Sequence, residues 1–385
     1  MSPTRRHFLA ASGATLLTLQ AGMVRSQPLV GPLAPAPLAP PPLAPWAVSG
    51  ATAADPRLAA MAWAVLAPNP HNRQPWALRL VGENDALLLC DLDRRLPETD
   101  PFDRQIVIGL GCFLELFRMA AAERGLNAAL TPFPEGEPTP RLDARPIAHI
   151  TLRPGGAKDP LFAAVPRRRS AKQPYDLTRP LPEGTRARLA SALLEPGRLG
   201  VASGDVAAIR DLTWRAWLIE ANTPAAWGES VELTRLGSAA VAAQPDGISL
   251  WGPQFDAMLA RGELSHAAMR AGQPGHAFAL RQYEAMLSAT NAYAWLTTPG
   301  NSRAEQLAAG RDWLRLNLAA TVAGLAMQPV SQALQEFPEM AGPYAEAPRL
   351  LNATGTVQML GRLGFATRPA PPTPRWPAES RILAG

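Results

Sequence analysis

Two side-chain amides that could bind a polar, planar ligand stand close together in one proline-rich segment. Residues 67–76 read APNPHNRQPW, with Asn72 and Gln74 two positions apart. Three prolines restrict the backbone of this segment, and each primary amide can donate and accept hydrogen bonds at once. An ordinary rigid turn is one interpretation. The other is a loop that holds a ligand whose edge carries both donors and acceptors.

A second segment combines cations with a hydroxyl group. Residues 167–172 read RRRSAK. Guanidinium groups make strong, charge-assisted and often bidentate hydrogen bonds to phosphate oxygens. This composition suits a phosphomonoester, although a run of cations is also typical of a solvated surface. The candidate phosphate ligands are Arg168, Arg169, Ser170 and Lys172.

Metal and acid–base chemistry have no comparable pattern. The five histidines show no paired metal-ligand spacing, and no residue stands out as a catalytic acid or base. Cys90 and Cys112 occur in apolar runs typical of buried free thiols, with a disulfide as the alternative. The formal net charge of +5 falls to +2 when Arg5, Arg6 and Arg25 are set aside, which gives no support to nucleic-acid binding.

The hydrophobic pattern of residues 51–158 predicts a first folded unit that presents the amide segment on a loop. The expected elements are helices over 55–66 and 101–125 and strands over 76–81, 86–91 and 147–152. The amide segment would then connect the first helix to the first strand, where its polar groups have fixed directions.

Residues 159–385 are predicted to form a second, helix-rich unit that opens with the basic segment. The expected elements are helices over 183–194, 205–221, 224–236, 302–327 and 344–351 and strands over 199–203, 292–298 and 356–363. Residues 245–275 are rich in Gly and Pro and are interpreted as a lid-like insertion. A proline-rich tail ends the chain, and the whole is expected to be an α+β protein.

The first residues have the layout of a twin-arginine export signal. Residues 4–9 read TRRHFL and precede an apolar run that is too short and too weak for a membrane span. We therefore expect residues 1–27 to be a signal and residues 28–50 to be a Pro/Ala-rich linker. The folded protein is expected in the periplasm, and because this route carries folded proteins, a bound cofactor is expected as well.

Most of residues 55–377 resembles the nitroreductase superfamily. The amide segment is similar to the A-P-S-x-x-N-x-Q-P-W loop of that family, with Asn69 where serine is usual. In the family this loop lies against the edge and the ribityl chain of the flavin. The resemblance therefore implies FMN as the cofactor and adds these candidate binding residues: Pro68, Asn69, Asn72 and Gln74.

The same resemblance assigns the basic segment and the C-terminal region to the flavin. Residues 167–175 resemble the R-R-S-x-R-x-F motif that binds the FMN phosphate, with Lys172 in place of arginine. Residues 361–377 resemble the final strand and basic tail, which makes Arg368 and Arg375 further phosphate candidates. Residues 314–332 resemble the helix and turn that approach the reactive face of the flavin, which adds Gly324 and Pro329.

One more cation follows from the resemblance. Residues 103–105 read DRQ and match a position where exported, fused members often carry Arg-Glu or Arg-Gln. A cation near N1 and the C2 carbonyl would stabilise the anionic reduced flavin. Arg104 or Lys172 is the candidate for this role.

The order of the motifs implies an internal pseudo-dimer. An ordinary nitroreductase builds each site from two subunits, but here the amide loop precedes the basic motif, and each occurs once. The resemblance thus implies two related halves, each with a mixed β-sheet flanked by helices. It also implies one complete flavin site per chain, and whether chains pair further is left open.

Three functions are compatible with this pattern. The first is an oxidoreductase that reduces a small nitro, quinone or enone acceptor, with the flavin supplying the electron chemistry. An exported protein would not meet a nicotinamide pool, so a membrane quinol or a redox protein is the expected donor. The second function is a protein that holds flavin without turnover, with residues 245–275 covering it. The third is an exported α+β protein without flavin.

Overall fold

The computed structural model describes residues 41–48 and 52–383. The chain divides into two compact units, residues 1–38 and residues 39–385, and all described residues belong to the second unit. The expected signal over residues 1–27 and most of the expected linker lie outside the described residues.

The first sheet has five strands in the order β11-β1-β2-β4-β3. Their bounds are β1 (Trp76–Val81), β2 (Asp85–Cys90), β3 (Leu126–Pro132), β4 (Ala148–Pro154) and β11 (Ile382–Leu383). In β4 the buried side chains alternate with partly buried ones, as expected for a strand with one face on the core. All pairings are antiparallel except that of β11 with β1, so the sheet is mixed, as expected.

The second sheet has four strands in the order β5-β8-β10-β9. Their bounds are β5 (Leu199–Ser203), β8 (Ala292–Thr298), β9 (Ala326–Pro329) and β10 (Thr356–Gly364). Every pairing among them is antiparallel, so the mixed sheet expected for both halves occurs only in the first. The expected helix over 302–327 stops at Val322, because Gly324 takes a left-handed φ of 70° and β9 follows.

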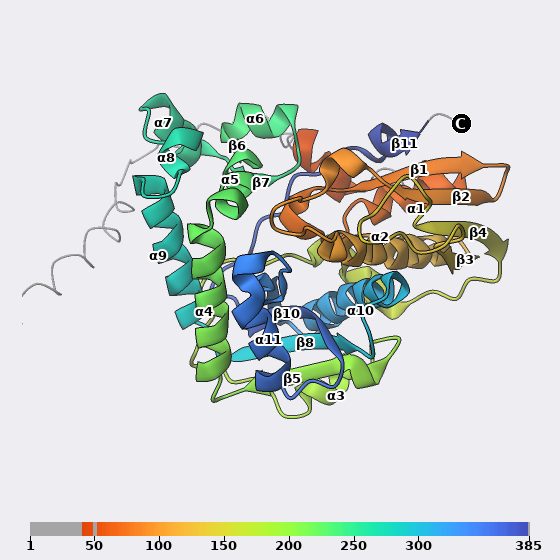
Figure 1. Ribbon diagram of the computed structural model, residues 1–385. Coiled ribbons are helices and arrows are strands. Elements are labelled where there is room, and N and C mark those ends of the chain that lie inside the picture. The colour runs from red at the N-terminus through yellow and green to blue at the C-terminus, as the bar shows by residue number, and fades with distance from the viewer. Residues whose placement is uncertain (1–40, 49–51, 384–385) are drawn as a thin grey trace, which may run out of the picture. The chain divides into compact units, whose positions relative to one another are not determined.

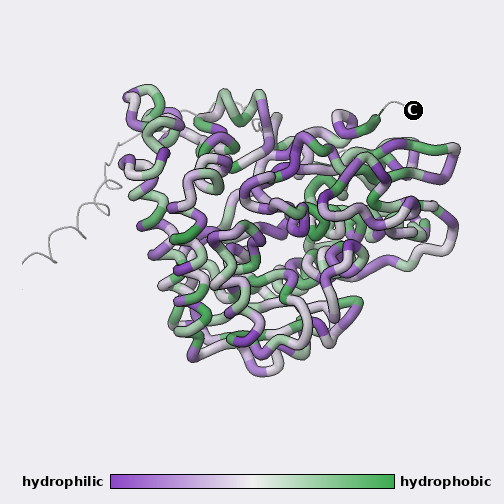
Figure 2. The backbone as a smooth tube through the Cα atoms, in the orientation of Figure 1, coloured by the Kyte–Doolittle hydropathy of each residue, from purple (hydrophilic) through white to green (hydrophobic). Residues whose placement is uncertain are grey.

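Two 20-residue helices, α2 (Arg104–Glu123) and α10 (Arg303–Val322), lie between the two sheets (Figure 1). Much of α2 and of the first sheet is hydrophobic (Figure 2). By length and composition α2 is the one described helix that could cross a membrane, but most of it is buried in this protein's core. The apolar character of α2 is therefore explained by its packing.

The two central helices cross at a pair of glycines. A Cβ atom on Gly111 would lie 2.1 Å from the carbonyl oxygen of Leu307, and one on Gly310 would lie 2.0 Å from that of Ile108. No other residue type fits at either position without moving a backbone. The contact is reciprocal, as at a two-fold axis, because both glycines are the eighth residues of their helices and both carbonyls belong to the fifth.

The halves share more than this crossing. Strands β1, β2, β4 and β3 of the first sheet have the same order as β5, β8, β10 and β9 of the second. In each half the central helix follows the second strand of this set and precedes the third. A short helix and a 3-10 turn also precede the first strand in each half: α1 (Pro56–Ala64) with η3 (Pro70–Asn72), and α3 (Thr185–Ala190) with η6 (Pro196–Arg198).

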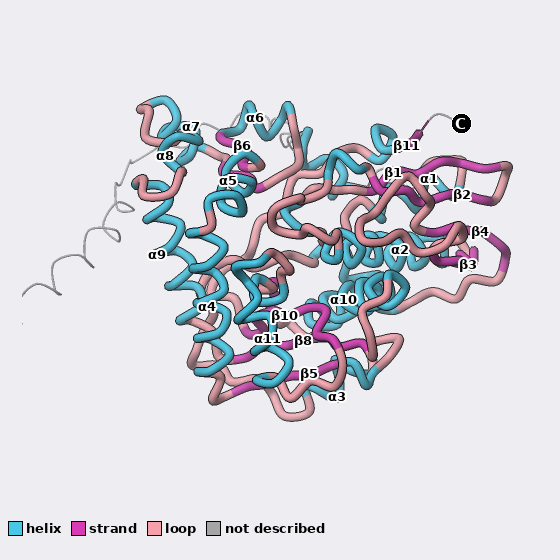
Figure 3. Tube along the Cα trace, viewed as in Figure 1, coloured by secondary structure: helices cyan, strands magenta, loops and turns pink. Residues whose placement is uncertain are grey.

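The second half contains a large, mostly helical insertion between β5 and β8 (Figure 3). Its elements are α4 (Ala207–Asn222), α5 (Pro224–Glu232), β6 (Thr234–Leu236), α6 (Gly237–Ala243), β7 (Ile248–Leu250), α7 (Pro253–Ala260), α8 (His266–Met269) and α9 (Pro274–Ser288). The expected lid over 245–275 is thus the middle part of a longer, ordered insertion. Another helix, α11 (Ala341–Leu350), precedes β10.

The two ends of the described chain pack outside the units to which the sequence analysis assigned them. After β10 the tail returns to the first half, where Ile382 pairs with Leu78. The 3-10 helix η1 (Pro41–Ala47) packs against this tail, and the carbonyl of Pro42 accepts a hydrogen bond from the backbone of Arg375 at 2.8 Å. Residues 41–47 of the expected linker thus form a 3-10 helix in contact with the tail.

Candidate functional site

The amide loop, residues 67–75, is held in a strained backbone conformation. His71, Asn72 and Gln74 have φ values of 45°, 51° and 51°, a region that non-glycine residues adopt only when their surroundings impose it. Asn69 closes the loop by accepting a hydrogen bond from the backbone N–H of Gln74 at 2.7 Å. Pro68 is buried at its start. Clustered strain of this kind is typical of ligand-binding loops.

Both amides of this loop contact distant parts of the chain. Asn72 donates to the carbonyl of Pro374 at 3.0 Å and accepts from Arg375. Gln74 is fully buried; it accepts from the backbone N–H of Trp376 at 2.9 Å and donates to the carbonyl of Pro245 at 2.7 Å. The loop therefore joins the tail to the first residues of the expected lid.

Three arginines converge beside this loop. Arg168 donates to the carbonyl of Leu66 at 3.1 Å, and Arg375 donates to that of Ala67 at 3.1 Å. Arg168 and Arg375 are each only 3% exposed, and Arg169 is partly buried. Arg168 and Arg169 come from the basic motif and Arg375 from the tail, so the structure brings these sequence candidates together.

These cations have no acidic partner within the described part of the chain. None of Arg168, Arg169 and Arg375 forms an ion pair there, and Nη1 of Arg168 and Nε of Arg375 are buried without a hydrogen-bond partner. Burial lowers the pKa of Arg168 to about 10. Burial, followed by the charges of Arg168 and Arg169, holds the pKa of Arg375 well below its usual value. Buried cations without a counter-charge are costly, so this cluster fits an anion such as a phosphate.

The second sheet positions the basic motif. Ser170 forms a bridge with Met327 in β9, and the N–H of Ala171 donates to the Met327 carbonyl at 3.0 Å. Arg362 in β10 is fully buried, lies 4.1 Å over the ring of Tyr175 and donates to the Ala171 carbonyl at 3.0 Å. Sequence reasoning assigned Arg362 no role, although a cation inside an apolar strand was a visible signal.

Two further cations among the candidates, Lys172 and Arg368, are exposed. Lys172 is exposed, and its charge lies close enough to His71 to contribute, after burial, to lowering the pKa of that imidazole to about 4. Nε2 of His71 lies 3.0 Å from the hydroxyl of Ser230 in α5. Arg368 is exposed, and Gln173 donates to its backbone carbonyl.

The three remaining candidates are Arg104, Gly324 and Pro329. Arg104 is buried, and its hydrogen bonds all go to residues 334–358, including one to the Gln358 carbonyl at 2.9 Å. Gly324 is exposed and ends α10, with no atom within 4 Å of an added Cβ. Pro329 ends β9 opposite Gly361. The contacts of Arg104 and Gly324 thus give no support to their expected flavin roles.

Arg104 has a counterpart that accounts for its position. Arg303, the first residue of α10, donates to the carbonyls of Pro138 and Pro140 at 3.1 and 2.8 Å, between β3 and β4. Arg104, the first residue of α2, donates to the carbonyl of Leu334 and to Glu336, in the matching connection between β9 and β10. Each arginine therefore ties its helix to the opposite half.

A buried carboxyl group beside residues 332–335 was not predicted. Glu220 in α4 is 2% exposed, and Gln335 donates to its Oε2 at 2.7 Å. Burial, with a smaller contribution from Glu229, raises the pKa of Glu220 to about 7. Tyr283 lies nearby, stacked on Trp217 with ring centres 3.5 Å apart. No sequence pattern marks Glu220, because its burial depends on packing between the insertion and residues 332–335.

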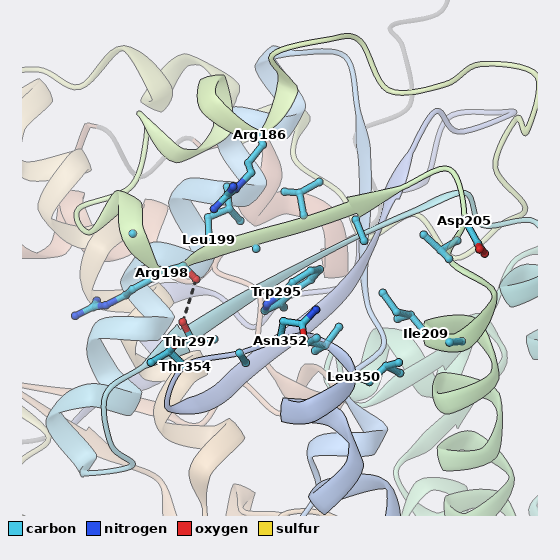
Figure 4. A pocket seen from close by; sticks show the side chains of 18 of the residues that line it. Arg186, Arg198, Leu199, Asp205, Ile209, Trp295, Thr297, Leu350, Asn352 and Thr354 are labelled. Atoms are coloured by element: carbon cyan, nitrogen blue, oxygen red, sulfur yellow. Dashed lines mark hydrogen bonds between the residues drawn. The ribbon is translucent and has the colours of Figure 1, made fainter.

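A surface pocket of about 780 Å³ lies elsewhere, over the second sheet (Figure 4). Its lining includes Arg186, Trp295 and Asn352, and none of the sequence candidates. The chemistry-bearing residues are thus concentrated at the amide loop and the three-arginine cluster, away from this pocket.

Comparison with known proteins finds relatives that match most of this chain. A protein of Mycobacterium tuberculosis strain H37Rv, provisionally named an NAD(P)H nitroreductase, is 31% identical over 337 residues, covering 82% of this chain and 90% of the relative. A second, uncharacterised protein of that strain is 26% identical over 336 residues, covering 82% of this chain and 89% of its own length. No protein-family model matches.

Solved structures resemble a little more than half of the chain. The FMN-dependent nitroreductase of Mycobacterium smegmatis in complex with NADPH is 21% identical, with a TM-score of 0.30 over 54% of this chain and 89% of that one. A nitroreductase-like protein of Bacillus cereus is 10% identical, with a TM-score of 0.32 over 59% of this chain and 97% of that one.

Proposed function

The chain belongs to the nitroreductase family, and from this premise we propose that it is an FMN-binding oxidoreductase. The observation that carries the proposal is the cluster of Arg168, Arg169 and Arg375, which are cations without an acidic partner in the described chain. Bound FMN would supply the electron transfer chemistry. The protein would bind, orient and shield it.

The residues around the cluster suit the two ends of FMN. Arg168 and Arg375 would direct their unpartnered N–H groups to the phosphate. Asn72 and Gln74 of the amide loop would contribute donors and acceptors to the ribityl chain and the pyrimidine edge. Asn72 accepts a hydrogen bond from Arg375 of the cluster, and Gln74 accepts one from the backbone of the next residue, Trp376, which supports this placement.

We also propose that the chain is an internal pseudo-dimer with one complete site. The reciprocal glycine crossing, the paired roles of Arg104 and Arg303, and the shared strand order support two related halves. In the second half, the turn that corresponds to the amide loop is held by Asp312, which accepts from the Leu194 N–H at 2.7 Å and from Arg198 at 3.0 Å. That turn, residues 191–198, has no amide pair.

The first prediction is one FMN per chain. Protein loaded with excess FMN and then desalted should release flavin at a concentration equal to that of the protein, because the described residues contain one amide loop beside one three-arginine cluster. Flavin released by acid and identified by chromatography measures this ratio. A ratio near two would contradict the single site, and a protein that retains no flavin would contradict the proposed function.

For the reaction we propose reduction of a small nitro, quinone or enone acceptor. The name of the M. tuberculosis relative favours a nicotinamide as the electron donor, whereas an exported protein would need a quinol or a redox protein. Anaerobic mixing of the FMN-loaded protein with NADPH, NADH or a soluble quinol, followed by the loss of flavin absorbance, separates these donors.

A second candidate function is flavin holding without turnover. It is favoured by the way the insertion closes on the amide loop. The N–H of Gly247 donates to the Asn72 carbonyl at 3.2 Å, and the buried Asp246 pairs with Arg94 at 2.6 Å and Arg235 at 2.8 Å. If no donor reduced the bound flavin faster than it reduces free FMN, flavin holding would be favoured over an oxidoreductase.

We propose periplasmic export by the twin-arginine route on the basis of residues 4–9 alone. Replacing Arg5 and Arg6 by lysine keeps the charge but removes the arginine pair, so the protein should accumulate in the cytoplasm with its flavin bound. Cell fractionation followed by flavin fluorescence measures both properties. If the variant still reached the periplasm, the twin-arginine assignment would be wrong.

A further inference from the structure

The ring of Trp46 lies against all three guanidinium groups of the cluster. The Cζ atom of Arg169 is 4.3 Å from the ring centre, and those of Arg375 and Arg168 are 5.7 and 5.9 Å away. These distances are within the range of cation–π attraction. The ring of Trp46 is therefore within cation–π range of all three arginines. Trp46 belongs to a segment outside both halves of the fold.

Two hydrogen bonds fix the segment that carries this ring. Nε1 of Trp46 donates to the carbonyl of Thr373 at 2.7 Å, and the N–H of Arg375 donates to the carbonyl of Pro42 at 2.8 Å. Helix η1 and the tail are thus joined at Thr373 and at Arg375 itself. The cluster is enclosed by this pair of segments and by the amide loop.

The ring covers part of the cluster, and Arg169, the arginine nearest to it, is partly buried. Trp46 is itself partly exposed, whereas Arg168 and Arg375 are almost fully buried. On the opposite side the same two arginines donate to the carbonyls of Leu66 and Ala67, at the end of α1. A ligand group that continued beyond the phosphate on the Trp46 side would have to displace the ring.

The charge of the cluster favours a terminal phosphate. A phosphomonoester carries between one and two negative charges near neutral pH and has three terminal oxygens. A phosphate that is esterified on both sides, as in the pyrophosphate of FAD, offers fewer free oxygens and less charge per phosphorus. Three guanidinium groups without an acid therefore match the end of FMN better than the middle of FAD.

We propose that Trp46 determines cofactor specificity, by closing the phosphate end of the site so that it accepts FMN and excludes FAD. This inference rests on the proposed flavin function. It assigns a role in selection to Trp46, a residue that the family resemblance did not mark.

The test is a comparison of FMN and FAD affinities in the full-length protein. Apo protein is titrated with each flavin, and binding is followed by quenching of flavin fluorescence. The wild type should prefer FMN, and Trp46→Ala should reduce the ratio of the two affinities by about tenfold or more, the scale of one altered pocket contact. Trp46→Phe keeps a ring over the cations and should retain most of the preference.

Trp295→Ala is the matched control, because this tryptophan lies on the second sheet against Gly200, away from the cluster. It should leave the ratio unchanged. An unchanged ratio in Trp46→Ala, with FMN still bound, overturns the role of Trp46 alone. A wild type that binds FAD as tightly as FMN overturns it too, whereas a wild type that binds neither flavin overturns the proposed function as well.

Discussion

Replacing Arg168 and Arg169 together by alanine should abolish most of the preference of the protein for FMN over riboflavin. Each charge-assisted hydrogen bond to the phosphate that is lost costs about 1.5 to 3 kcal/mol. Two such losses amount to about 3 to 6 kcal/mol, or about two to four powers of ten in the dissociation constant. Riboflavin has no phosphate, so its affinity should change little.

The apo form of this variant should be at least as stable as the wild type. Arg168 is buried without an acid nearby, and its lowered pKa reflects the cost of keeping that charge in the protein. Removing it relieves repulsion from Arg375. Added FMN should raise the melting temperature of the wild type but not that of the variant, because ligand stabilisation follows affinity.

Arg167→Ala provides the control, since this neighbouring arginine is exposed. It should leave FMN affinity close to that of the wild type. Equal weakening of FMN and riboflavin in the double variant would show that Arg168 and Arg169 support the loop instead of the phosphate. Titration calorimetry with both ligands, together with thermal melts, distinguishes these results.

The sequence predicted most of the elements that have a strong local pattern. Strands β5 and β8 have the expected bounds, because each is a short, largely apolar run next to turn-forming residues. Strand β3 was missed because much of it is only partly buried and its order depends on β4. Strand β11 is two residues long, and only its pairing with β1 makes it a strand.

The sequence predicted which residues belong to the candidate site, but not how the chain brings them together. Arg168 and Arg375 are about two hundred residues apart, so their approach depends on the tail returning to the first half. The resemblance to nitroreductases supplied that link in advance. It did not supply Trp46, because a tryptophan in a proline-rich segment reads as part of a linker until its contacts with Thr373 and Arg169 are seen.

The burial of Glu220 also depends on tertiary packing, which places an ionisable carboxyl group in the core. Glu220 is a buried residue of α4, with amide groups as partners and no cation in contact within the described residues. Glu229 adds repulsion, and Tyr283 and Gln332 stand close by. A carboxyl group in such surroundings is more stable protonated than ionised.

Glu220 should therefore make the protein less stable as the pH rises from 4.5 to about 7. Its pKa is about 7 in the folded protein against 4.5 in the reference state. Because the folded pKa is raised, the stabilisation is fully present below pH 4.5 and is lost as the pH rises through about 7. The loss amounts to about 3 kcal/mol in the free energy of unfolding. Glu220→Gln stays neutral at every pH, so this part of the pH dependence should be absent in the variant.

Chemical denaturation of the wild type and Glu220→Gln at pH 4.5, 6 and 8 measures this difference. The two proteins should be similar at pH 4.5, and the variant should be more stable at pH 8. Other buried groups, such as Asp100 with a pKa raised to about 6 by burial, contribute equally to both proteins and cancel in the comparison. Glu284→Gln alters an exposed carboxyl on α9 and should follow the wild type. Parallel pH profiles for the wild type and Glu220→Gln would show that Glu220 is ionised in the folded protein at neutral pH, and that its surroundings stabilise the carboxylate after all.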